Sequence, residues 1–204
     1  MKMNTKTMTG LWWLTAAFLS MGVNAAELET PEEVGLRVGA RAPAFTLKDQ
    51  NGKDVSLDSL LKRGPVALVF YRSADWCLFC KYELMHLQRN LKEFEAAGGQ
   101  VVGISYDSIP KLKRFSASQT ITFPLLSDPK STTIDAYGVR DQTASDPKAG
   151  YATHATFVLD QEGVVRAKLL KVIYQEQPGV GFLVKALKDA RSPERNNSTS
   201  QGIQ

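Results

Sequence analysis

The sequence is poor in the residues that cross-link small domains or bind metals in them. It contains two cysteines and two histidines among 204 residues. Two cysteines close at most one covalent loop, so the apolar core, not a disulfide framework, must hold the fold together. A zinc site with four ligands would use Cys77, Cys80, His86 and His154 together, and these histidines lack zinc-finger spacing. The sequence therefore disfavours a structural metal site.

The sequence also lacks the charge pattern of a protein that binds polyanions. Its formal net charge is +4, and lysine and arginine form no long run. We predict no nucleic-acid partner from so mild a charge.

No apolar stretch reaches the roughly 20 residues that a transmembrane helix needs. The apolar segment Leu11–Met21 follows Lys2 and Lys6 and precedes the small residues of Val23–Ala25. A positive region, an apolar region and small residues in this order are typical of a secretory signal peptide. We predict a signal peptide at residues 1–25, cleaved after Ala25, with a retained membrane anchor as the alternative.

Export would decide the redox compartment of the mature chain. Disulfides persist in the bacterial periplasm and outside cells. We therefore expect a periplasmic or secreted protein with no stable membrane association after cleavage. The residues from 26 to 190, about 165 in number, suit one domain. We predict a polar leader at residues 26–38, a folded domain at 39–190, and a disordered tail rich in Ser, Asn and Gln at 191–204.

The two cysteines lie close together, with two residues between them. Cys77 and Cys80 follow the apolar run Pro65–Tyr71, where a strand gives way to a segment with helical periodicity. The start of a helix has unpaired N–H groups and a positive dipole end, which stabilise a thiolate. The thiolate is the reactive form of cysteine, so this position predicts a redox site, with an inert disulfide as the simpler alternative.

The order of elements predicts an α/β fold. Val66–Tyr71 and Val101–Ser105 have the continuous apolar pattern of buried strands. One helix is expected between them, because apolar residues recur there at helical spacing: Cys77, Cys80, Leu84, Leu87, Leu91 and Phe94. Thr156–Asp160 and Val164–Lys168 predict a hairpin, followed by a helix over Val180–Ala190. This is the thioredoxin-like arrangement, a central mixed β-sheet flanked by helices with the cysteines at the carboxyl end of a central strand.

Several short segments resemble the redoxin group, in particular peroxiredoxins of the alkyl hydroperoxide reductase and thiol-specific antioxidant (AhpC/TSA) type. The resemblance covers roughly residues 39–190. The matching segments occur in the family order: Ala42–Leu47, Val69–Arg72, Trp76–Cys80, Glu83–Leu84, Phe123–Asp128, Ala136–Val139 and Thr156–Asp160. The Trp-Cys-x-x-Cys motif within this body is similar to that of thioredoxin-like proteins.

The chain departs from the peroxiredoxin pattern at three positions. The resemblance aligns the peroxide-reacting cysteine with Cys80, three residues before Glu83. Cys77 then stands where the family has the threonine that hydrogen-bonds the peroxide, and Ser73 stands at the family proline. His154 stands near the family's activating arginine, which is also where thioredoxin-like proteins have a cis-proline.

The resemblance implies a redox-active Cys77–Cys80 disulfide and leaves open which cysteine attacks first. In the peroxidase order, Cys80 attacks a hydroperoxide and Cys77 condenses with the resulting sulfenic acid. In the thioredoxin order, Cys77 attacks a substrate disulfide and Cys80 resolves the mixed disulfide. Cys77 is expected to be the more exposed thiol.

Four further residues are candidates for supporting the site. Trp76 is expected to form a wall of it, and Arg72 to contribute a positive charge. Glu83 is either a proton shuttle or a solvated helix residue. His154 is either a functional hydrogen-bonding residue or an ordinary polar residue at the start of a strand.

We therefore expect an exported thiol-dependent peroxidase that uses no cofactor or metal. Its partners would be a hydroperoxide and a reducing thiol protein of thioredoxin type. The alternative is a thiol–disulfide oxidoreductase acting on exported proteins. A third possibility is a non-catalytic binding module, whose inert disulfide would have a reduction potential below about −300 mV. The particular substrate, the reductant and the oligomeric state do not follow from the sequence.

Overall fold

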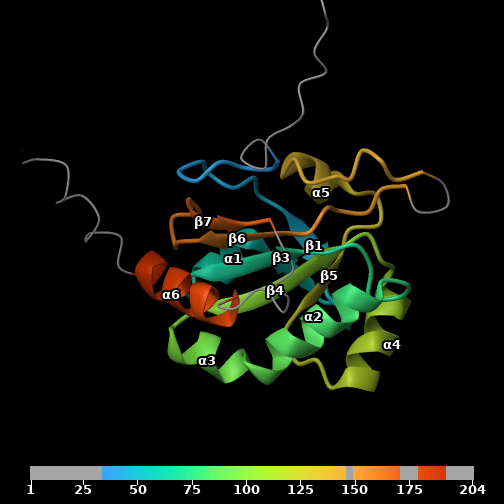
Figure 1. The fold of residues 1–204 in the computed structure, drawn as a ribbon, viewed down its shortest axis with the longest axis horizontal. Coiled ribbons are helices and arrows are strands. Elements are labelled where there is room, and N and C mark those ends of the chain that lie inside the picture. The colour runs from blue at the N-terminus through green and yellow to red at the C-terminus, as the bar shows by residue number, and fades with distance from the viewer. Residues whose placement is uncertain (1–33, 146–148, 171–178, 192–204) are drawn as a thin grey trace, which may run out of the picture.

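The computed structural model describes residues 34–145, 149–170 and 179–191. The predicted signal peptide, the leader up to residue 33 and the predicted tail beyond residue 191 lie outside the described residues. Within the described part, one 7-stranded sheet has the order β2-β1-β5-β4-β3-β6-β7 (Figure 1). The strands are β1 (Thr46–Lys48), β2 (Asp54–Ser56), β3 (Val66–Phe70), β4 (Gln100–Ser105), β5 (Leu125–Ser127), β6 (Ala155–Leu159) and β7 (Val165–Leu169).

The sheet is mixed, as predicted. Strand β3 pairs in parallel with β4 and antiparallel with β6. β6 and β7 form the predicted antiparallel hairpin. β3 is buried along its whole length, because its neighbours and the helices cover it on all sides. The thioredoxin-like fold expected from the sequence is confirmed.

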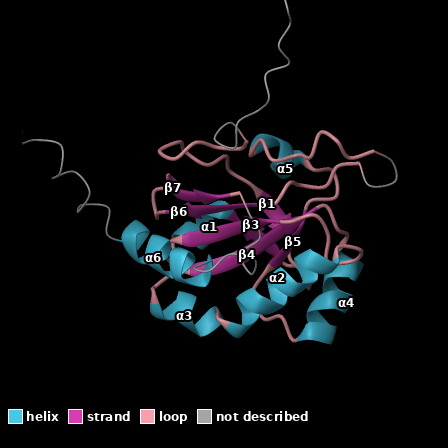
Figure 2. Cartoon of the chain, in the orientation of Figure 1, coloured by secondary structure: helices cyan, strands magenta, loops and turns pink. Residues whose placement is uncertain are grey.

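Helices cover both faces of the sheet (Figures 1 and 2). They are α1 (Leu57–Leu61), α2 (Leu78–Arg89), α3 (Leu91–Ala96), α4 (Ile109–Gln119), α5 (Thr132–Ala136) and α6 (Gly179–Arg191). Ala67 and Val69 of β3 face the core beneath α2, α3, α4 and α6. Leu68 and Phe70 face the opposite core with α1 and α5. Because successive side chains of a strand point to opposite faces of the sheet, β3 contributes to the cores on both faces.

The single helix predicted over Cys77–Phe94 is wrong in two respects. Cys77 is not in the helix but caps it, and the helix is interrupted at Asn90, so that α2 and α3 are separate. The Asn90 side chain donates to the carbonyl oxygen of His86 at 2.8 Å. This bond offers the backbone an alternative to helical pairing, which is why asparagine is unfavourable inside helices. The apolar spacing continues across the interruption, so periodicity alone could not reveal it.

Candidate active site

The cysteine pair lies where the chain leaves β3 and enters α2. Cys77 has extended backbone angles (φ −91°, ψ 102°) and caps α2, its sulfur accepting from the Cys80 N–H at 3.2 Å. The two residues are disulfide-bonded with their Cα atoms 5.3 Å apart. Cys77 is 4% exposed and Cys80 0%. The expected difference in exposure is therefore slight, since both thiols are almost fully enclosed.

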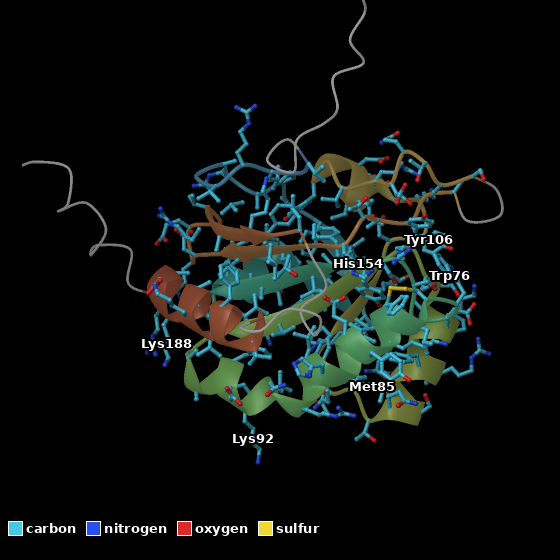
Figure 3. The ribbon with its side chains drawn as sticks, in the orientation of Figure 1. Trp76, Met85, Lys92, Tyr106, His154 and Lys188 are labelled. Carbon is cyan, nitrogen blue, oxygen red and sulfur yellow. A yellow bond between two sulfur atoms is a disulfide. The ribbon has the colours of Figure 1, made fainter. Side chains whose placement is uncertain are left out.

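His154 contacts the inner cysteine. Its Nε2 lies 3.5 Å from Cys80 Sγ, and its Nδ1 lies 3.1 Å from Glu83 Oε2. The register explains this meeting: Phe70 of β3 pairs with Ala155 of β6, so the residue before β6 lies beside the loop that carries the cysteines. Figure 3 shows His154 next to the yellow disulfide.

The contacts of the imidazole fix its tautomer. Arg72 Nε donates to His154 Nε2 at 3.4 Å, so this nitrogen carries a lone pair. The other nitrogen then carries the proton and donates to Glu83. Glu83 is 1% exposed, so its interpretation as a solvated helix residue is wrong. The structure therefore brings Arg72, Glu83 and His154 together around Cys80, with a basic nitrogen facing its sulfur.

Trp76 forms part of an aromatic wall beside the pair. Its indole Nε1 donates to the Tyr106 hydroxyl at 2.8 Å, and its ring lies edge-on to Tyr151 with centroids 5.4 Å apart. Sequence analysis gave no role to either tyrosine. Tyr106 directly follows β4, the parallel neighbour of β3, and its position at a strand's carboxyl end was the signal that could have found it.

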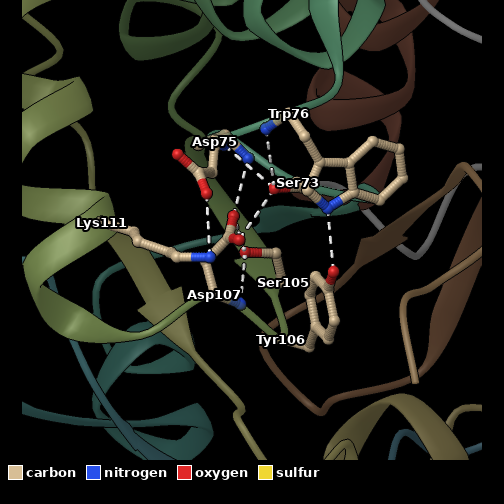
Figure 4. Close-up of polar contacts among 8 residues, drawn as sticks. Ser73, Asp75, Trp76, Ser105, Tyr106, Asp107 and Lys111 are labelled. Atoms are coloured by element: carbon tan, nitrogen blue, oxygen red, sulfur yellow. Dashed lines mark hydrogen bonds and ion pairs between the residues drawn. The ribbon is translucent and has the colours of Figure 1, made fainter. Parts of the chain in front are cut away.

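Asp107 holds the loop that precedes the cysteines and is a third residue that sequence analysis missed. Its carboxylate accepts from the Ser73 hydroxyl at 2.8 Å, the Ala74 N–H at 2.6 Å and the Ser105 hydroxyl at 3.1 Å (Figure 4). The Ser73 hydroxyl in turn accepts from the Asp75 N–H at 2.9 Å. Burial nevertheless raises the pKa of Asp107, because desolvation outweighs these bonds. A hydrogen-bonded serine thus fixes this loop, where the family resemblance leads one to expect a proline.

An ion pair closes the outer side of the same loop. Lys111 of α4 lies 2.8 Å from the Asp75 carboxylate and lowers its pKa. Both side chains are about two-fifths exposed, at 43% and 39%, so the pair orients the loop more than it stabilises the fold.

Known proteins match this chain in both sequence and fold. The AhpC/TSA family model matches residues 38–168. This chain belongs to the AhpC/TSA family. It is 38% identical over 146 residues to alkyl hydroperoxide reductase E of Mycobacterium bovis, covering 71% of this chain and 88% of that protein. It is 38% identical over 128 residues to chloroplastic peroxiredoxin Q of Suaeda salsa, covering 63% of this chain and 57% of that one.

Solved structures agree with this assignment. The crystal structure of peroxidoxin BcpB from Mycobacterium tuberculosis has a TM-score of 0.68 at 28% identity, covering 78% of this chain and 99% of that one. A structure of Xanthomonas campestris peroxiredoxin Q has a TM-score of 0.60 at 25% identity, covering 68% and 89%. The AhpC/TSA chain described here is a peroxiredoxin-type oxidoreductase, and Trp76, Cys77 and Cys80 form its Trp-Cys-x-x-Cys motif.

The zinc site weighed from the sequence does not form with both histidines. Among the described residues, the ligand atoms that lie within 4.8 Å of one another belong to Cys77, Cys80 and His154. His86 lies elsewhere on α2 and is not in this group.

No helix in the described ranges is long and apolar enough to cross a membrane.

Proposed function

We propose that this AhpC/TSA protein is an exported peroxidase that reduces hydroperoxides through Cys80, with Cys77 as the resolving thiol. The observation that carries the proposal is the 3.5 Å contact between Cys80 Sγ and the lone-pair nitrogen of His154. Among the described residues, the histidine whose ring nitrogen lies close to the cysteine sulfurs is His154. A general base must lie within hydrogen-bond reach of the proton that it takes.

The proposed reaction uses these groups in sequence. In this reaction the Arg72 N–H first moves off His154 Nε2, and the reduced Cys80 thiol then gives its proton to this nitrogen. The thiolate attacks one oxygen of the hydroperoxide. The O–O bond breaks, the alkoxide takes the proton from His154 and leaves as an alcohol, and Cys80 becomes a sulfenic acid. The Cys77 thiol attacks that sulfur, water leaves, and the disulfide forms. A dithiol protein of thioredoxin type then reduces the disulfide and is itself oxidised.

Arg72 and Glu83 support this chemistry from the two sides of the imidazole. The Arg72 guanidinium carries a positive charge beside the nitrogen that faces Cys80, where it would stabilise a thiolate. The Glu83 carboxylate orients the ring through its contact with Nδ1. In this proposal, His154 and Arg72 together replace the threonine and arginine that the resemblance leads one to expect.

The predicted export of the chain also supports a peroxidase that cycles through a disulfide. The signal-like segment at residues 1–25 would deliver the chain to a compartment where a disulfide cycle can operate.

A second function, thiol–disulfide exchange with exported proteins, is favoured by one observation. Leu78 and Phe79, the two residues between the cysteines, are 59% and 52% exposed, and Tyr82 on the next turn is 52% exposed. An exposed apolar rim around a disulfide suits the docking of another protein chain. In this function Cys77, at the start of α2, would attack and Cys80 would resolve.

Single-cysteine variants separate the two functions. We expect reduced Cys77→Ser to form a sulfenic acid with peroxide in a stopped-flow assay, and Cys80→Ser to form none. The reverse pattern, in which Cys80→Ser accumulates mixed disulfides with partner proteins and Cys77→Ser forms no sulfenic acid, would establish the exchange function instead. A reduction potential of the wild-type disulfide below about −300 mV would point to an inert disulfide.

A further inference from the structure

The reduced cysteine pair and His154 form a compact set of metal ligands. Cys77 Sγ, Cys80 Sγ and a ring nitrogen of His154 lie within 4.8 Å of one another. Reduction of the disulfide by two electrons frees both sulfurs while the backbone holds them on one side of the histidine. We propose that this reduced site binds one monovalent copper ion through the two sulfurs and His154 Nε2.

The histidine is oriented as a metal ligand should be. Its Nδ1 faces the Glu83 carboxylate at 3.1 Å, and its Nε2 lies 3.5 Å from Cys80 Sγ. The Nε2 lone pair accepts from Arg72 Nε at 3.4 Å, so copper would replace this hydrogen bond. A histidine that binds a metal typically donates its other ring N–H to a carboxylate or carbonyl in this way, and that partner raises the basicity of the ligand. Glu83 is a positioning residue here, since it orients the ligand without reaching the ion.

The number and type of the ligands select the metal. Two thiolates are soft donors, which favour monovalent copper, whereas structural zinc requires four protein ligands. Within residues 34–145, 149–170 and 179–191, the cluster holds three ligand residues and no fourth. Water has little access to complete a tetrahedron, because the His154 side chain is 12% exposed and the cysteines 4% and 0%.

The charge of the site fits the same ion. Two thiolates and one monovalent copper ion carry a net charge of −1. The Arg72 guanidinium, once its N–H has turned away from His154 Nε2, would remain close enough to offset this charge. Binding releases the two thiol protons and changes no oxidation state. The bound sulfurs can neither attack a peroxide nor close a disulfide, so copper binding and the redox cycle exclude each other.

The test is an anaerobic titration of the reduced full-length chain with monovalent copper, in competition with bicinchoninate. We expect one copper per chain. Cys77→Ser and Cys80→Ser should each lose this binding, and His154→Ala should weaken it at least about 10-fold. Glu83→Gln, which removes the carboxylate that orients His154, should weaken copper binding by roughly 10-fold and by less than His154→Ala does. His86→Ala is the matched control, since it removes the other histidine of the chain, and its affinity should equal that of wild type.

Three outcomes would overturn the copper site. These are binding of no copper by the reduced wild type, equal affinities for His154→Ala and His86→Ala, and zinc binding at least as tight as copper under the same competition. X-ray absorption of the copper-loaded chain should show two sulfur donors and one nitrogen donor, which checks the ligand set without relying on variants. A peroxide assay on metal-free protein is run in parallel, so that a missing peroxidase activity and a missing copper site are told apart.

Discussion

His154 is the residue whose replacement tests the proposed proton transfer most directly. We expect His154→Gln to lower the second-order rate of Cys80 with hydroperoxide roughly 10²-fold, because no base then faces the sulfur. Stopped-flow measurement on the reduced protein gives this rate. The matched control is His86→Gln on α2, which should react like wild type. If both variants kept the wild-type rate, the imidazole would have no part in the reaction.

Asp107 gives the site a pH-dependent contribution to stability. Burial raises its pKa in the folded chain above the unfolded value of 3.8. Between these two pKa values the native state binds more protons than the unfolded state, so this contribution is fully present below pH 3.8 and is lost as pH rises through the raised value.

Replacing this carboxylate should isolate the effect. We expect Asp107→Asn to be less stable than wild type by about 1–3 kcal/mol at acidic pH, because the amide cannot accept all three bonds. The difference should shrink as pH rises from about 4 and then become constant. Urea unfolding at a series of pH values measures it. A difference that grew with pH would contradict the raised pKa.

At the scale of single residues, the sequence located the cysteines and named Arg72, Trp76, Glu83 and His154 as candidates, but it missed the residues that follow β4. Cys77 and Cys80 could be found because their spacing is local and they follow an apolar run. Tyr106 and Asp107 follow another strand about 30 residues later and reach the site only because β3 and β4 pair in parallel. Such contacts depend on register, which a single sequence does not specify for side chains so far apart.

At the scale of elements, a buried glutamine joins the first hairpin to β5. Gln50 is 5% exposed; its amide nitrogen donates to the Phe123 carbonyl at 3.1 Å and its oxygen accepts from the Leu125 N–H at 2.8 Å. The Gln50 side chain thereby makes two hydrogen bonds to the backbone at the start of β5, as a neighbouring strand would. That start pairs with Gly103 of β4, which in turn pairs with Val69 of β3, so it lies near the carboxyl ends of these strands.

Both hydrogen bonds of Gln50 go to backbone groups outside the site, so we expect Gln50 to stabilise the fold without taking part in the chemistry. We expect Gln50→Leu to lower the free energy of unfolding by roughly 2 kcal/mol, because it leaves two buried backbone groups unpaired. Asn51→Ala, at the exposed neighbouring position, should change it by no more than about 0.5 kcal/mol. Urea unfolding provides the measurement. A large loss of peroxide reactivity in folded Gln50→Leu would show that this contact also affects the site.

Elements were predictable where one periodicity dominated. The buried strands β3 and β4 and the β6–β7 hairpin lie where the apolar pattern placed them. The interruption between α2 and α3 was not predictable from that pattern, because Leu91 and Phe94 continue the apolar spacing beyond Asn90. Asn90 ends α2 there, and its side chain donates to the His86 carbonyl, a local contact that the apolar pattern does not reveal.

At the scale of the whole molecule, the export of the chain remains a prediction. We expect N-terminal sequencing of the mature protein to begin at Ala26, because small residues precede it after an apolar segment. Ala25→Leu should slow the cleavage, since the signal peptidase requires a small residue at this position. Recovery of the full-length chain in the membrane fraction would instead establish a retained anchor.

The position of Cys77 at the start of α2 affects how the enzyme would respond to excess hydroperoxide. The two Cα atoms are 5.3 Å apart while α2 is intact, so no turn of helix has to unwind before the sulfurs meet. A sulfenic acid at Cys80 would therefore be intercepted by its neighbour before a second peroxide could carry it to the irreversible sulfinic state. Enzymes whose resolving thiol must travel leave that intermediate exposed for longer. Under the proposed reaction, the chain should therefore keep its activity when hydroperoxide is in excess.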